Sequence, residues 1–282
     1  MSNRWMPSWA AVLLALAASL LLGCRRGGET PSKPPATQSA PANRAPRAGD
    51  AVTNSLGMKL LYVPAGTFTM GSPLDEAGRH DDEVSHPVTI SRGFYIGATE
   101  VTQAQWQAVM GFNRSETTGE NLPVSRLSWH HAVTFCKKLS QAEGRTVRLP
   151  TEAEWEYACR AGSAEAFAGT GKVDEMGWHM DNSDERPHRV ATKKPNAWGL
   201  YDLHGNVAEW CADRYARELP AGAARDPAGP ATGTYRVARG GSWGHFARAA
   251  RSAARASFNP AYQLDTLGLR VVMEPTQPKP GR

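Results

Sequence analysis

Arg148-Leu-Pro-Thr-Glu-Ala-Glu-Trp-Glu-Tyr-Ala158 is the most informative stretch of this 282-residue sequence. Thr151 and Glu154 have the spacing of a capping box, in which the side chain of each residue accepts a hydrogen bond from the main-chain N–H of the other. Trp155 then begins an apolar face at helical spacing, and Gly162 stands where such a helix would end. The stretch therefore predicts a short, well-capped helix that buries one face.

Two other segments carry helix start signals of the same kind. Thr102 and Gln105 form a second capping box, and Ser128 opens a third helix that ends near Gly144. Gly, Asn, Asp, Ser and Pro are frequent between residues 169 and 234, which predicts long loops. Short strand-like runs occupy residues 58–71 (two runs around a Pro-Ala-Gly turn), 88–90, 94–96, 207–211, 235–237 and 267–273. The pattern predicts an α+β domain, rich in loops, with short strands and about three helices.

Residues 1–23 have the features of a secretory signal peptide: Arg4, a short apolar run and a small residue before the cleavage point. The apolar run is shorter than the roughly 20 residues that a membrane-spanning helix needs. Leu21-Leu22-Gly23-Cys24 also resembles the bacterial lipobox, which implies lipidation of Cys24 and a membrane anchor in the cell envelope. By the same resemblance, Arg25 favours the outer membrane, with the protein facing the periplasm. An ordinary signal peptide followed by a chance Cys is the alternative.

Composition divides the rest of the chain into a tether, a domain and a tail. Residues 24–50 are rich in Pro and Ala, lack aromatic and large aliphatic side chains, and are predicted to be a disordered tether. Residues 51–274 are the predicted domain, and residues 275–282 a disordered tail. The net charge of +5 comes from segments outside the domain, so the sequence does not indicate a nucleic-acid-binding protein.

Three cysteines, Cys136, Cys159 and Cys211, lie in the predicted domain. An exported protein meets an oxidising compartment, where two of them could form a disulfide and leave one thiol unpaired. The alternative is that all three are small, buried, apolar residues. The sequence does not choose between these two arrangements.

Several strings along the domain carry a resemblance to one family. They are Val63-Pro-Ala-Gly-Thr-Phe-Thr-Met-Gly71, Ala98-Thr-Glu-Val-Thr102, Pro123-Val-Ser125 with Ser128-Trp129, Arg148 to Ala158, Pro195-Asn-Ala-Trp-Gly-Leu-Tyr-Asp-Leu-His-Gly-Asn206, Glu209-Trp210, Arg239-Gly-Gly-Ser-Trp243 and Gly268-Leu-Arg270. Together they resemble the formylglycine-generating enzyme, or sulfatase-modifying factor, family, in the order of that family and over about residues 52–274. The resemblance implies the fold of that enzyme, a loop-rich relative of the C-type lectin fold.

The resemblance also implies an oxidase whose metal ligands this chain lacks. The founding enzymes of the family use two cysteines shortly after the Gly-Gly-Ser string to hold copper(I) and activate oxygen, and soft thiolates suit that metal. Here the corresponding positions fall near His245 and Ala250, and no cysteine follows Cys211. Copper is therefore not expected as a cofactor, and formylglycine generation by that mechanism is not predicted.

A calcium site is the metal site that the resemblance carries over to this chain. The family binds calcium through a side-chain oxygen, two main-chain carbonyls and a Glu, and the matching positions are Asp202, Gly205, Val207 and Glu209. Ala208 replaces the Trp that is usual in this string, which removes no expected ligand. The alternative is that the two carboxylates only cap turns or pair with Arg.

The segment after the Gly-Gly-Ser string borders the substrate groove in the family and is rich in arginine. Guanidinium groups suit a ligand that carries a carboxylate or phosphate. The candidate groove contacts are Trp243, His245, Arg248 and Arg251. The competing interpretation, which we favour for the arginines between positions 236 and 255, is that they pair with the Glu-rich helix 152–156.

Gly240-Gly-Ser-Trp-Gly244 formally matches the nucleophile elbow of serine hydrolases, and the helix-like residues 246–257 follow it. In such hydrolases the catalytic His lies much further downstream, whereas the last His of this chain is His245. The sequence therefore does not predict a serine hydrolase.

These observations predict an exported, lipid-anchored, calcium-stabilised module without formylglycine-generating activity. Such a module would bind a protein, a peptide or an envelope ligand, or assist another protein. The alternative is a metal-dependent oxidoreductase of the same superfamily, which would modify a peptide or small molecule with non-haem iron. That alternative requires candidate ligands to converge in space, namely His179, His188, His204 and His245.

Overall fold

The computed structural model describes residues 45–219 and 222–276. The predicted signal peptide, Cys24, most of the tether and most of the tail lie outside this part. Within it, none of the helices has the length and apolar character needed to cross a membrane. The Gly49 N–H donates to the Tyr62 carbonyl, and the Tyr62 N–H donates to the Asp50 carbonyl. Residues 49 and 50 are therefore hydrogen-bonded to β2.

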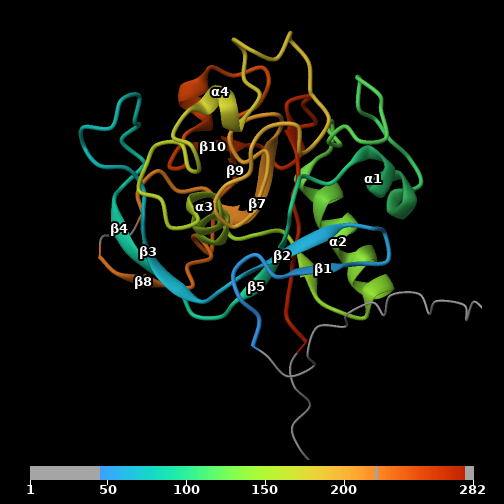
Figure 1. The fold of residues 1–282 in the computed structure, drawn as a ribbon, viewed down its shortest axis with the longest axis horizontal. Coiled ribbons are helices and arrows are strands. Elements are labelled where there is room, and N and C mark those ends of the chain that lie inside the picture. Colours follow the sequence, from blue (N-terminus) through green and yellow to red (C-terminus); the bar gives the residue numbers. More distant parts are fainter. Residues whose placement is uncertain (1–44, 220–221, 277–282) are drawn as a thin grey trace, which may run out of the picture. The chain divides into compact units, whose positions relative to one another are not determined.

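Short strands form three sheets in the described residues, as the strand-like runs predict (Figure 1). The first sheet has the order β1-β2-β5-β12-β6, the second β10-β9-β7-β11 and the third β3-β4-β8. Their bounds are β1 Ala51–Thr53, β2 Lys59–Val63, β3 Gly66–Met70, β4 His86–Ile90, β5 Phe94–Gly97, β6 Val147–Arg148, β7 Ala208–Arg214, β8 Ala224–Arg225, β9 Arg236–Arg239, β10 Arg255–Phe258, β11 Leu267–Gly268 and β12 Val272–Met273.

The predicted strand over residues 267–273 is two strands in two different sheets. β11 pairs in parallel with β7, whereas β12 pairs antiparallel with both β5 and β6. Between them the buried Arg270 side chain turns inward and pairs with Glu209. The C-terminal part of the domain is thus held between strands from its first half.

The three predicted helices are confirmed; two begin at their predicted capping boxes, and Ser128 forms a third box with His131 that was not predicted. The N-caps are Thr102, Ser128 and Thr151, and in each box both reciprocal hydrogen bonds are present. A further single turn, α4, follows in the loop-rich region. The bounds are α1 Gln103–Met110, α2 Trp129–Glu143, α3 Glu152–Arg160 and α4 Val173–Met176.

The helix-like run over residues 246–257 does not form one helix, so this prediction is wrong. Residues Ala247–Ala250 make a 3₁₀ turn, η1, and strand β10 begins at Arg255. The Arg251 side chain is drawn into ion pairs with the loop before β4, and Arg255 lies opposite Arg239 in the neighbouring strand. These tertiary contacts outweigh a local helical preference of a few tenths of a kcal/mol per residue.

Two apolar clusters form the core of the domain. One packs beneath α1 and α2, where Trp106 and Phe135 stack with ring centroids 5.2 Å apart. The other surrounds α3, whose Trp155 is fully buried between β7, β9 and the third sheet. Figure 1 shows α3 in the middle of the domain, with α1 and α2 together at one side. The central position of α3 brings its acidic side chains next to the arginine-rich segment.

A candidate groove above a buried charge network

The Gly-Gly-Ser turn after β9 positions the first candidate side chains. Gly240 and Gly241 both have positive φ, and a Cβ on Gly241 would lie 2.9 Å from the main chain of Ala249. The turn therefore packs directly on η1. Ser242 is buried at its end, and its Oγ lies 2.6 Å from the Nδ1 of His245. Burial lowers the pKa of His245, so its imidazole is neutral at pH 7.

No cysteine thiolate is available beside this turn. Cys136, Cys159 and Cys211 are free and buried, so the predicted alternative of a disulfide is wrong and that of three buried thiols is confirmed. Burial raises the pKa of Cys136 and Cys159 to about 12, and it raises the pKa of Cys211 as well. The carbonyl of Ala250 accepts a hydrogen bond from the Nδ1 of His204. The two positions expected for the copper ligands are occupied by His245 and Ala250, which carry an imidazole and a methyl group instead of thiols.

A hollow of about 160 Å³ lies against His245. A second hollow of about 330 Å³ adjoins it, because His80 and Arg255 line both. We call the two hollows together the groove. Ala208, at the position where the family usually has Trp, is one of the small residues that leave the first hollow open. Its other lining residues are Ala238, Gly240, Gly241, Ala249, Ala254, Ala256 and Phe258.

The candidate groove contacts divide between surface and interior. Arg248 is exposed, with its guanidinium 5.2 Å from the centroid of the Phe246 ring, and Phe246 is itself half exposed. Trp243 is only partly exposed, and its Nε1 donates to the carbonyl of Asp265. Phe246 is not among the predicted groove contacts. Its position as a lone aromatic residue in a run of Ala and Arg was a sequence feature that could have indicated an exposed ligand contact. Arg248, His245 and Phe246 are therefore available to a ligand.

Arg251 is not a groove contact, and this prediction is corrected. Its side chain is 2% exposed and forms ion pairs with Glu76 and Glu83, at 2.5 and 2.6 Å. Its guanidinium also donates to the carbonyls of Gly78 and Arg248. All three guanidinium nitrogens are thus occupied, and Arg251 fastens the loop over residues 72–85 to the start of the segment after η1.

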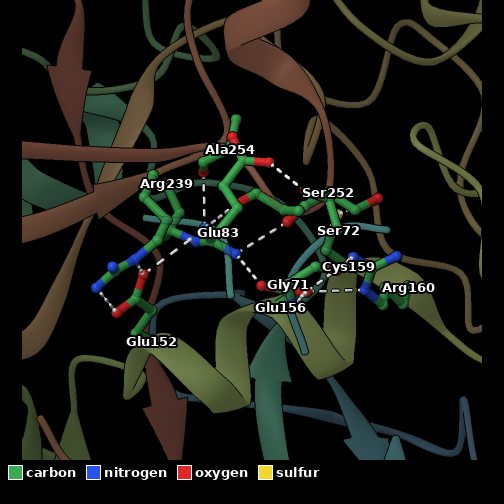
Figure 2. A network of polar contacts seen from close by, with 12 residues as sticks. Gly71, Ser72, Glu83, Glu152, Glu156, Cys159, Arg160, Arg239, Ser252 and Ala254 are labelled. Carbon is green, nitrogen blue, oxygen red and sulfur yellow. Dashed lines mark hydrogen bonds and ion pairs between the residues drawn. The ribbon is translucent and has the colours of Figure 1, made fainter. Parts of the chain in front are cut away.

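Arg239 and Arg255 pair with α3, as the favoured interpretation predicts. Figure 2 shows Arg239 between Glu152 and Glu156, whose carboxylates lie 3.7 and 2.5 Å from its guanidinium nitrogens. Glu156 also pairs with Arg160 at 2.8 Å. Arg255 makes two hydrogen bonds to Glu152, at 2.7 and 2.9 Å. These arginines hold β9 and β10 against the helix instead of offering donors to a ligand.

The predicted calcium-binding turn is strained and buried. Asp202 and Asn206 have positive φ without being glycine, and Gly205 lies between them at φ 135°. The Oδ1 of Asp202 is buried without a hydrogen-bond partner, as an oxygen reserved for a cation would be. Both oxygens of Glu209, in contrast, accept hydrogen bonds from Arg270, and one accepts a further bond from Trp155. The turn thus fits a calcium ion through Asp202, while Glu209 is held by Arg270.

The four histidines proposed for an iron centre do not converge. His179 contacts Asp174 at 2.7 Å, and His188 contacts the carbonyl of Ser183 at 2.7 Å. His204 is buried between the Ala250 carbonyl and the Ala168 N–H, and burial lowers its pKa to about 4. Among residues 45–219 and 222–276, no three His, Cys, Asp or Glu side chains gather as a metal centre would require.

The sheets, the capped helices and the groove without thiols define a class: domains built on the formylglycine-generating-enzyme fold, a relative of the C-type lectin fold, that lack its cysteine pair. Residues 47–275 match the family described as the sulfatase-modifying factor enzyme 1-like domain, and the chain belongs to that family.

Named relatives of the chain include a chaperone and several enzymes. The chain is 32% identical to the chaperone protein LppX of Paenibacillus barcinonensis, over 55% of this chain and 71% of that protein. It is 28% identical to the formylglycine-generating enzyme of Mus musculus, over 90% of this chain and 87% of that protein. The family thus does not by itself select an activity for this chain.

Two solved structures share the fold closely. Treponema denticola variable protein 1 is 31% identical, with a TM-score of 0.71, over 80% of this chain and 99% of that one. PvdO from Pseudomonas aeruginosa is 28% identical, with a TM-score of 0.75, over 82% of this chain and 100% of that one. The described domain therefore shares the fold of these two proteins over nearly their whole length.

Proposed function

We propose that this chain is an exported accessory module of the cell envelope that binds a protein or peptide ligand in the groove. One observation carries the proposal: the groove is present, but the positions of the oxidising cysteine pair hold His245 and Ala250. The three cysteines of the domain are buried, and their raised pKa values keep them protonated. The module therefore retains the binding surface and lacks the thiolates of the founding chemistry.

The chemistry of the groove suits a peptide segment. Its first hollow is narrow and lined mostly by Ala and Gly, so it accepts a small apolar side chain. Phe246 and Arg248 are exposed near it, and they offer an aromatic face and a cation to the rest of a ligand. The similarity to a chaperone supports an accessory role. The lipobox-like Cys24 supports a membrane anchor on the periplasmic side of the outer membrane.

Calcium is part of the proposal as a structural ion. Asp202, with the main-chain carbonyls of Gly205 and Val207, would hold the ion, and Glu209 would stay with Arg270. A bound calcium ion would supply a positive charge to the otherwise unpartnered Asp202 oxygen. It would thereby fix the turn that leads into β7, the strand that carries Ala208 into the groove.

Crosslinking from the groove tests the proposal. Phe246 is replaced by a photoreactive phenylalanine derivative in the full chain, expressed in bacteria, and Thr134 on the exposed side of α2 is replaced in the same way as a matched control. We expect an envelope protein or peptide to be captured at position 246 and not at position 134. Equal capture at both positions, or capture at neither, would contradict a binding groove.

Chemical analysis separates the binding module from an oxidoreductase. The full chain, purified in detergent without metal-chelating resin, is assayed for calcium, copper and iron, and then for oxidation of a sulfatase peptide with added copper. The proposal expects calcium near one per chain and no aldehyde product. Stoichiometric copper or iron, or peptide oxidation, would favour the enzyme instead.

A further inference from the structure

A further cavity, which shares no lining residue with the groove, lies beside the first turn of α3. Its volume is about 270 Å³, and its walls are mainly apolar. Met70 of β3, Ala153 of α3 and Ala224 of β8 contribute to the walls, together with Pro227. We call it the Asp213 cavity, because the side chain of Asp213 at the end of β7 is its most unusual lining group.

Asp213 is a buried carboxyl group in the lining of this cavity. Its side chain is 3% exposed, and the only hydrogen bond that it accepts from another described residue comes from the N–H of Glu152, 2.9 Å from Oδ2. A Cβ placed on Gly229, which also lines the cavity, would lie 3.2 Å from Oδ1. Oδ1 therefore lies beside Gly229, at the edge of the cavity.

Asp213 has no direct ion-pair partner among the described residues. Glu152, in contrast, forms ion pairs with Arg255 and Arg239. The guanidinium of Arg236 is committed elsewhere: it stacks over Trp129 and donates to the carbonyl of Ala212. A buried carboxylate without a cation is unfavourable, so this site gains stability from a ligand that brings a positive charge.

We propose that the Asp213 cavity binds a primary ammonium group carried on a short hydrocarbon chain, such as an alkylamine or the end of a lysine side chain. The ammonium group would donate to Oδ1 of Asp213, and the hydrocarbon would lie along Met70, Ala153 and Ala224. The volume suits a ligand of this size, since sites for drug-sized molecules span roughly 300–1,000 Å³. Among the residues that the structure describes, no three His, Cys, Asp or Glu side chains gather here as a metal centre would require.

The surrounding titratable groups set the pH dependence of this binding. Burial and the charge of Glu152 raise the pKa of Asp213 to about 7. Glu154 acts in the same direction, and Arg236 is close enough to interact electrostatically with Asp213. The buried His86 and the exposed Glu218 also line the cavity. Protonation of Asp213 removes the partner of the ammonium group. Amine binding should therefore weaken as the pH falls below 7.

The test compares three probes of equal length on the full chain at pH 8.5: n-pentylamine, n-pentanol and pentanoate. Titrations are followed by the NMR signals of the Ala153 and Ala224 methyl groups. We expect the amine to bind at least tenfold more tightly than the alcohol, and pentanoate not to bind. The amine should also lose at least tenfold in affinity at pH 5.5. Equal binding of amine and alcohol would overturn the proposal and leave only an apolar cavity.

Two variants and a control complete the experiment. Asp213→Asn keeps the acceptor for the Glu152 N–H and should abolish the preference for amine over alcohol. Ala228→Trp at the exposed edge of the cavity should block both probes without disturbing the core. Asp184→Asn removes an exposed carboxylate elsewhere and should change nothing. Retention of the amine preference in Asp213→Asn, with the fold intact, would refute the assignment of Asp213.

Discussion

Replacement of Asp213 by Asn should change how the stability of this domain depends on pH. The two side chains have nearly the same shape, and both accept the hydrogen bond from the N–H of Glu152. The substitution therefore removes the ionisable group and little else. Because the side chain is 3% exposed, solvent screens its charge weakly, and the effect of that charge on the free energy of unfolding should be measurable.

The direction and size follow from the pKa of this carboxyl group. Burial, with the neighbouring Glu152 charge, raises that pKa from 3.8 to about 7 in the folded chain. The folded state therefore binds the proton more tightly than the unfolded state between pH 4 and pH 7. This contribution to stability is complete below pH 4 and is lost as the pH rises to 7. Between pH 5 and pH 8.5 the loss amounts to roughly 3 kcal/mol.

Urea unfolding of the full chain and of Asp213→Asn at half-unit steps from pH 5 to pH 8.5 measures this quantity. The difference in the free energy of unfolding between variant and parent should move in favour of the variant by roughly 3 kcal/mol over that range. Other titrating groups are common to both proteins and cancel in the difference. A difference that stays constant with pH would refute the argument, because it would mean that Asp213 is ionised in both states throughout.

Three further results are expected. Glu156→Gln should lower the free energy of unfolding in urea by about 3–5 kcal/mol, because it leaves the charge of the buried Arg239 partly uncompensated. The control Glu165→Gln, at an exposed position, should change that free energy by less than about 0.5 kcal/mol. Equal effects of the two substitutions would contradict the buried network. Arg251→Met should speed proteolytic cleavage of the loop over residues 72–85, which that arginine anchors, and unchanged cleavage would show that the loop is held otherwise. Calcium at about 100 times its dissociation constant should stabilise the full chain by about 2.7 kcal/mol in thermal unfolding, and a response that persists in Asp202→Ala would place the ion elsewhere.

The candidate site was only partly predictable from the sequence. The absence of the cysteine pair can be read directly, and of the predicted contacts His245 lines the groove while Arg248 is exposed close to it in the chain. Arg251 shows the limit of such reasoning. In sequence, an arginine that lines a groove cannot be distinguished from one that forms ion pairs with a distant loop. The difference depends on Glu76 and Glu83, which lie 175 and 168 positions away.

The Asp213 cavity gave no signal in the sequence. Asp213 follows a strand, where a polar residue is ordinary, and its partner Glu152 is 61 positions away. Burial alone makes this carboxyl unusual, and burial depends on how β7, α3 and the third sheet pack together. A single sequence without the fold therefore contains no feature that distinguishes Asp213 from an exposed aspartate.

The sequence by itself determined the local features of this domain: the starts of its three main helices, most of its short strands and the absence of thiols beside the Gly-Gly-Ser turn. Each depends on residues within a few positions of one another, whose hydrogen bonds and side-chain alternation hold in almost any context. Only the tertiary structure decided which arginine neutralises which glutamate, which helix-like run becomes a strand, and which carboxyl group faces an apolar cavity. Charge pairing and burial are set by distances between remote segments, and those distances exist only once the chain has folded.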